Sequence, residues 1–186
     1  MLFDTLLHEN MSEKGLELWK KLELRIPNIW KRLSSSSRKY HKDENGNVQT
    51  IEEHTYEMIF AACKLLSIFE VEPKTKEADI ILLGIILHDS AKYGKEDPLY
   101  REHTCKNHDH IIGDMISLSK NTFLKYFDSN EVYLLEEMCR FHAGHWATNW
   151  VENETSFKKL DPKTLFIHFL DMFSTRNLIK IPKENI

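Results

Sequence analysis

The chain has 186 residues, of which 41% are hydrophobic and 29% charged, and its formal net charge is -4. This length and balance predict a single soluble globular domain over residues 1–186, long enough to bury a full core. The negative net charge argues against binding to nucleic acids or membrane surfaces, because proteins that bind either usually carry an excess of basic residues.

The first part of the chain predicts a helical segment followed by a loop. Residues 1–33 contain a helix start at Ser12-Glu13 with apolar side chains at helical spacing after it, and Pro27 bends or ends that helix. Residues 34–50 are rich in serine and then in lysine, aspartate and asparagine, which is typical of a loop. We expect residues 51–180 to form the helical core.

The most apolar run of the chain, Ile80 to Leu87, predicts a buried helix that ends at His88-Asp89. The run is far too short to cross a membrane. An imidazole and a carboxylate at the end of an apolar helix are costly to bury unless something positive binds them, so the pair indicates a metal ion. Lys92 follows His88 by four residues and Asp89 by three, which places its ammonium on the same helical face.

Four other apolar or amphipathic segments carry histidine or aspartate as further candidate ligands. An aspartate in a nearly continuous apolar segment would cost several kcal/mol, or become neutral, without a partner. No strand-length alternation competes with these segments, so we predict an all-α fold with a metal site at its centre. The segments are residues 52–69 with His54, residues 111–118 preceded by His108 and His110, residues 136–146 with His142 and His145, and residues 165–173 with Asp171.

The chain carries three cysteines, Cys63, Cys105 and Cys139, at scattered positions without a Cys-x-x-Cys pair. This pattern predicts free thiols in a reducing compartment rather than disulfides or a zinc knuckle. The first nine residues also lack the basic lead and cleavage pattern of a secretion signal. We therefore expect a cytoplasmic protein.

Six short motifs follow one another along the chain from about residue 34 to residue 176. Together they resemble the HD-domain metal-dependent phosphohydrolases, an all-helical superfamily, and most closely its branch of small single-domain phage and bacterial proteins. The resemblance implies an HD-domain helical bundle in which residues 51–180 are the metal-binding core. The motifs are Ser35 to His41, Glu53-His54-Thr55, Leu87 to Gly94, His108 to Ile112, His142 to Trp146 and His168 to Arg176.

Two departures from the family pattern bear on the site residues. Asp109 stands where the family often has proline after a histidine, and a second histidine, His110, follows it. Either His108 or His110 could therefore be the ligand, and the register of the apolar residues favours His108. His145 occupies the variable position of a His-x-Gly-x-Trp element, and we interpret it as a substrate-pocket residue.

The resemblance implies one or two divalent transition-metal ions, and Zn, Mn, Fe, Co and Ni all suit mixed imidazole and carboxylate ligands. The presence of both additional histidines favours two ions, with Asp89 bridging them. One ion would be held by His54, His88, Asp89 and Asp171, and the second by Asp89, His108 and His142.

The chemistry implied is hydrolysis of a phosphate ester or anhydride of a nucleotide or similar small molecule. Asp89 and Lys92 would be the catalytic residues, with a metal-bound hydroxide attacking phosphorus and Lys92 offsetting the charge that develops. Lys39, His41 and Arg176 are candidates for contacting phosphate oxygens.

The acidic chain favours a small phosphorylated substrate over a polymer, so we expect neither nucleic acid nor a membrane as a partner. Two alternatives remain open. The first is a non-catalytic nucleotide-sensing or regulatory module with the same fold, and the second is a metal-dependent nuclease.

Overall fold

The computed structural model describes residues 2–23, 30, 32–34, 41–43, 45–94, 103–148, 150, 157–176 and 178–179. Strand-like pairing in these ranges is limited to two isolated antiparallel bridges. The all-α fold predicted from the sequence is thus confirmed. The α-helices are α1 (Leu2–Asn10), α2 (Glu13–Glu23), α3 (Ile51–Leu65), α4 (Lys76–Leu87), α5 (His108–Leu118), α6 (Lys120–Phe123), α7 (Ser129–Phe141) and α8 (Pro162–Thr175), and three 3-10 turns are η1 (Leu66–Phe69), η3 (Gly144–Trp146) and η4 (Phe157–Lys159).

Several helices begin at side-chain caps. Before α3, the Thr50 side chain accepts a hydrogen bond from the backbone N–H of Glu53. The Glu53 carboxylate in turn accepts one from the backbone N–H of Thr50. A second capping box of this kind begins α7 at Asp128. Asp161 caps α8 ahead of Pro162, as the Asp-Pro dipeptide predicts. These caps fix where each helix starts and therefore which side chains of its first turns face the core.

Helix α4 forms the centre of the bundle. Every residue from Ala78 to Ser90 is buried, as expected for a helix that is apolar nearly all round. The helix packs against α2, α3, α7 and α8. At Gly84, an added Cβ atom would lie only 2.7 Å from the Ile167 side chain and 2.9 Å from the Met138 side chain. The missing side chain thus lets α7 and α8 approach α4 closely.

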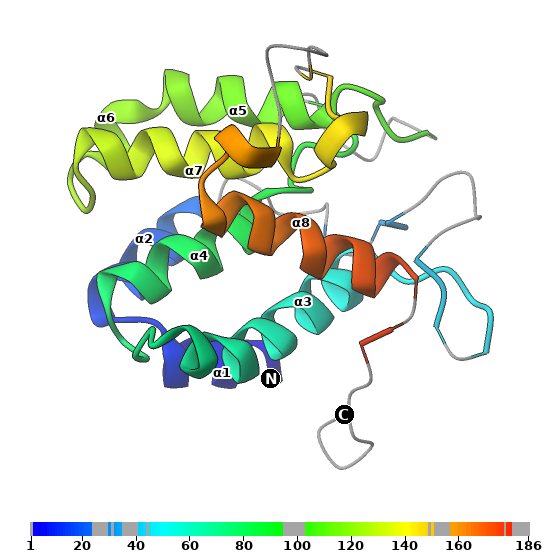
Figure 1. The fold of residues 1–186 in the computed structure, drawn as a ribbon, viewed down its shortest axis with the longest axis horizontal. Helices are drawn as coiled ribbons and strands as arrows, with labels where there is room; N and C mark the ends of the chain where they lie inside the picture. Colours follow the sequence, from blue (N-terminus) through cyan, green and yellow to red (C-terminus); the bar gives the residue numbers. More distant parts are fainter. Residues whose placement is uncertain are drawn as a thin grey trace.

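The helices lie in layers, with α5, α6 and α7 on one side of α4 and α8 and with α3 and α1 on the other (Figure 1). Helices α5 and α7 lie side by side, α8 crosses beside them and packs on both α7 and α3, and α1 lies against α3. The helix start predicted at Ser12-Glu13 is confirmed by α2, and α1 precedes it as a separate helix. Pro27 lies outside the described residues. Among the helices of the described ranges, none is both long enough and apolar enough to cross a lipid bilayer.

Candidate metal centre

Five helices contribute to one cluster of histidine and aspartate side chains at the centre of the fold. Most members of the cluster lie at or near a helix end, so the site forms where helix ends converge. Four of them are almost completely buried: His54, His88, Asp89 and His142 are at most 2% exposed. His54 lies in the first turn of α3, His88 and Asp89 follow α4, His108 begins α5, His142 follows α7, and Asp171 lies in the second half of α8.

The carboxylate of Asp89 divides its two oxygens between two pairs of imidazoles. Oδ2 lies 3.5 Å from Nε2 of His88 and 3.9 Å from Nε2 of His54. Oδ1 lies 3.1 Å from Nε2 of His108 and 3.7 Å from Nε2 of His142. One carboxylate therefore belongs to two adjoining groups of potential ligands, each with its ligand atoms within 4.8 Å of one another.

Three of the four histidines share the same local hydrogen bond. In each, Nδ1 lies against the backbone carbonyl of the residue three positions earlier, and a carbonyl oxygen can only accept. The hydrogen of the neutral ring is therefore on Nδ1, and Nε2 directs a lone pair into the cluster. The contacts are His88 with Ile85 at 2.6 Å, His108 with Cys105 at 3.0 Å, and His142 with Cys139 at 2.7 Å.

The spacing of these lone pairs fits a metal ion. Nε2 of His88 lies 3.3 Å from Nε2 of His54, and Nε2 of His108 lies 3.2 Å from Nε2 of His142. Two nitrogens that each lie about 2.0–2.1 Å from one ion are separated by about 2.8–3.4 Å at right-angled or tetrahedral geometry. Oδ1 of Asp89 is also buried without a hydrogen-bond donor among the described residues, which suits a metal ligand.

The protonation states at the cluster suit the same role. Burial lowers the pKa of His88 to about 3 and also lowers the pKa of His142, so both rings are neutral at pH 7. Burial acts to raise the pKa of Asp89, but the charge of Lys92 and the contacts with the imidazoles of His88 and His108 outweigh it and hold that pKa well below its usual value. Asp89 is therefore ionised, as a metal ligand has to be.

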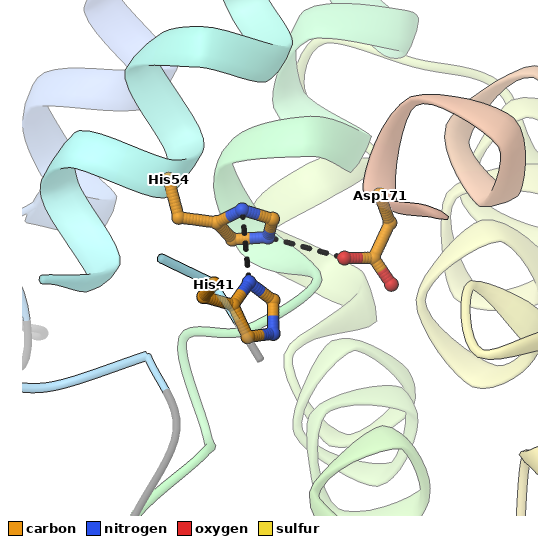
Figure 2. Close-up of side chains that lie close together, drawn as sticks. All are labelled: His41, His54 and Asp171. Atoms are coloured by element: carbon orange, nitrogen blue, oxygen red, sulfur yellow. Dashed lines mark hydrogen bonds and ion pairs between the residues drawn. The ribbon is translucent and has the colours of Figure 1, made fainter. Parts of the chain in front are cut away.

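Asp171 and His41 lie on different sides of the His54 ring (Figure 2). Oδ1 of Asp171 is 3.1 Å from Nε2 of His54, whereas Nδ1 of His41 is 3.3 Å from Nδ1 of the same ring. Burial raises the pKa of Asp171, and its contact with His54 lowers it by more, so this carboxylate is ionised. His41, His54 and Asp171 also form a group whose potential ligand atoms lie within 4.8 Å of one another, although Nδ1 of His54 already contacts Ser174 at 2.8 Å. His41 thus packs against the ring of a candidate ligand.

Lys92 supplies the cation closest to Asp89. Its Nζ forms an ion pair with Oδ2 of Asp89, and its side chain is 12% exposed, so it reaches the cluster from the solvent side. The carbonyl of Lys92 accepts the backbone N–H of Cys105 at 2.7 Å. That contact ties the turn after α4 to the segment that leads into His108.

The two histidines at the start of α5 have different surroundings. His108 belongs to the cluster, whereas Nδ1 of His110 lies 3.1 Å from Nη1 of Arg140 and Nε2 lies 3.4 Å from Asp114. Two positions along a helix correspond to a rotation of about 200°, so the two rings point in different directions. The arrangement brings His108, not His110, to Asp89.

The remaining candidates for substrate binding are not part of the cluster. His145 is exposed, and its ring stacks on Trp146 with the ring centroids 3.7 Å apart. Arg176 is exposed at the C-terminal cap of α8. Lys39 lies outside the described residues.

Some supporting contacts were not predicted from the sequence. Asp109 is buried and accepts hydrogen bonds from both the backbone N–H and the hydroxyl of Thr148, the latter at 2.7 Å. It thereby ties the start of α5 to the segment after α7, which explains an aspartate where proline was expected. Nδ1 of His168 donates to the carbonyl of His142 at 2.7 Å. The replacement of proline was the only sequence signal for the first contact.

Comparisons of the chain with protein-family models, with curated proteins and with solved structures find no match. What the geometry establishes is an all-α protein with a buried group of histidines and aspartates that could hold metal ions. The relation to HD-domain enzymes remains a resemblance in sequence motifs.

Proposed function

We propose that the chain is a metal-dependent phosphohydrolase of the HD type that hydrolyses a phosphate ester or anhydride of a nucleotide or similar small molecule. The observation that carries the proposal is the position of Asp89, whose two buried oxygens face two separate pairs of imidazole nitrogens. A carboxylate shared in this way is the usual bridge of a two-metal hydrolytic site.

The six cluster residues divide naturally between two ions. His54, His88, Asp89 and Asp171 would hold one, and Asp89, His108 and His142 the other. When bound, divalent ions at these positions supply activation of a water molecule near neutral pH and neutralise phosphoryl oxygens. The buried hydrogen bonds on Nδ1 of the imidazoles keep their Nε2 atoms directed at the ions.

Lys92 would act on the phosphoryl group. Its ammonium now contacts Asp89, and the partial exposure of its side chain leaves it on the path by which a substrate would approach. Once Asp89 is committed to metal coordination, the ammonium is free to turn toward a phosphoryl oxygen and offset the negative charge that develops there.

The other phosphate contacts remain proposals. Arg176 follows Asp171 by five residues, a rise of about 7.5 Å along a helix, so its guanidinium could reach a phosphate bound at the cluster. We propose the same for Lys39, and we place His145 at the rim of the pocket. His41, buried beside His54, would act on the ligand ring instead of the substrate.

The test is metal analysis of the purified chain, followed by hydrolysis assays on a panel of nucleotides and phosphate esters with Mn, Co, Ni or Zn. We expect up to two ions per chain and release of phosphate that Asp89→Asn abolishes. Nucleotide binding without turnover would favour a sensing module, and cleavage of RNA or single-stranded DNA would favour a nuclease. A folded chain that binds none of these metals would refute the proposal.

A further inference from the structure

A chain of hydrogen bonds behind His54 involves residues that the proposed hydrolysis does not use. Nδ1 of His54 lies 2.8 Å from the hydroxyl oxygen of Ser174, and this hydroxyl donates to Oε2 of Glu57 at 2.6 Å. Nε2 of Gln49 donates to the other oxygen of Glu57 at 2.5 Å. Because the Ser174 hydrogen is given to Glu57, the Ser174 oxygen accepts from His54, and Nδ1 of His54 therefore carries a hydrogen.

The position of His54 explains why it needs this support. His88 and His142 follow the ends of helices, where backbone carbonyls lack helical partners, and their Nδ1 atoms use those carbonyls. His54 lies inside α3, where the carbonyl three residues earlier is committed to the helix. A partner for its Nδ1 must therefore come from another element, and Ser174 of α8 provides it.

The two residues that support His54 lie on the same two helices as His54 and Asp171. Glu57 comes three residues after His54 on α3, and Ser174 comes three residues after Asp171 on α8, and the two helices pack together. Residues three apart lie on the same helical face. The pair Glu57–Ser174 therefore lies on the same two helices and next to the pair His54–Asp171.

We propose that Glu57, acting through Ser174, is the positioning residue that holds His54 in the tautomer and orientation needed to bind a metal ion. His54 and Ser174 are both 0% exposed, so bulk water does not reach the contact between them. The alternative neighbour, Nδ1 of His41, is 3.3 Å from Nδ1 of His54, a longer contact than the 2.8 Å to Ser174. The inference rests on the metal centre of the proposed function, but it does not depend on hydrolysis.

The test measures Co²⁺ binding by calorimetry and visible absorption on the full chain carrying His108→Ala, which leaves the ion at His54 to be followed alone. Glu57→Ala and Ser174→Ala should each weaken Co²⁺ binding about 10–100-fold and change its absorption spectrum, as losses of outer hydrogen bonds to a ligand do. If Glu57→Ala does not fold, Co²⁺ binding by Ser174→Ala still tests whether this hydrogen-bond chain supports His54.

Glu57→Gln should restore Co²⁺ binding to near that of the parent. Its amide oxygen can still accept from Ser174. Its new amide group can donate to Oε1 of Gln49 once the Gln49 amide turns over, since that oxygen has no hydrogen-bond partner among the described residues. The matched control is Glu52→Ala, which removes an exposed carboxylate from the first turn of the same helix and should leave binding unchanged.

Unchanged Co²⁺ affinity in both alanine variants would overturn the inference, as would an equal loss in Glu57→Gln. In the chain with His108 restored, an equal loss of affinity for both ions in Ser174→Ala would also overturn the inference. Such a result would indicate a general loss of packing, whereas a loss of support for His54 should weaken binding of one ion only. If the parent chain binds no Co²⁺, both the proposed metal centre and this inference are wrong. If the parent chain binds Co²⁺ but hydrolyses no phosphate ester or anhydride, only the proposed function is wrong.

Discussion

Nε2 of His108 lies 3.2 Å from Nε2 of His142, although 34 residues separate the two in the sequence. Both rings have their Nδ1 atoms against backbone carbonyls, so the facing nitrogens both carry lone pairs. Two lone pairs at this distance repel one another unless a cation or a proton lies between them. The pair is therefore the feature that separates a two-metal site from a one-metal site.

We expect His108→Ala to reduce the metal content by one ion per chain and His110→Ala to leave it unchanged. His108 faces Asp89, whereas His110 contacts Arg140 and Asp114 away from the cluster. Metal analysis after dialysis, normalised to protein concentration, checks both variants. The opposite pattern would mean that the start of α5 is shifted in the metal-bound protein. A wild-type content near one ion per chain would argue for a mononuclear site.

Asp89→Ala should remove both ions and all hydrolysis, because its two oxygens serve both groups of ligands. The substitution also leaves Lys92 without its ion-pair partner, so the folded state should be confirmed by circular dichroism. Asp114→Ala, at a half-exposed carboxylate of α5 outside the cluster, is the control for loss of one negative charge. Full metal content in the Asp89 variant would rule out the bridging arrangement.

Lys92→Ala should keep both ions and lower kcat about 10²–10³-fold, the usual effect of removing one group that stabilises charge in a transition state. Lys106→Ala removes an exposed lysine just before α5 and should leave kcat unchanged. The measurement is steady-state hydrolysis together with metal content. If Lys92→Ala loses metal, then the lysine acts by holding Asp89 in place and not by acting on the substrate.

The sequence predicted the helices and the convergence of their ends better than it predicted the contacts between them. Local signals such as Asp161-Pro162 and the apolar run before His88 predict a helix start and a buried helix from neighbouring residues alone. The contact of Asp109 with Thr148 spans 39 residues, and that of Ser174 with Glu57 spans 117. No local periodicity encodes such pairs, because they arise only when two helices pack together.

The metal-free protein should lose stability as the pH falls below about 6.5. The unfolded chain binds a proton on a histidine near pH 6.5, whereas the folded pKa is about 3 for His88 and about 2 for His41. Between these values the unfolded chain holds more protons, so acid favours unfolding, by about 1.4 kcal/mol per pH unit for each such ring. The depressed pKa values of Asp89 and Asp171 act in the same direction, but only below about pH 3.8.

Urea denaturation of chelator-treated protein from about pH 7 to about pH 5 measures this dependence. The midpoint should fall across the range, and His88→Gln should flatten the fall because one of the titrating rings is gone. His8→Gln removes an exposed histidine of α1 and should leave the slope unaltered. A midpoint that stays constant or rises with acid would contradict the assignment of buried neutral rings.

Gly144→Ala should destabilise the protein more than Gly46→Ala, although both glycines have positive φ values, 61° and 83°. A Cβ atom at Gly46 meets nothing within 4 Å, so Gly46→Ala costs only the left-handed backbone strain, about 1–2 kcal/mol. At Gly144 the same atom would lie 2.6 Å from the His168 ring, whose Nδ1 donates to the carbonyl of His142. Relieving that clash costs about 1–3 kcal/mol of stability in addition, because it must displace the His168 ring and with it the backbone of His142.

Urea midpoints measure the difference in stability between the two variants. Metal analysis should show weaker binding of the second ion in Gly144→Ala alone. Equal midpoints in the two variants would mean that His168 moves aside freely and does not hold the backbone of His142.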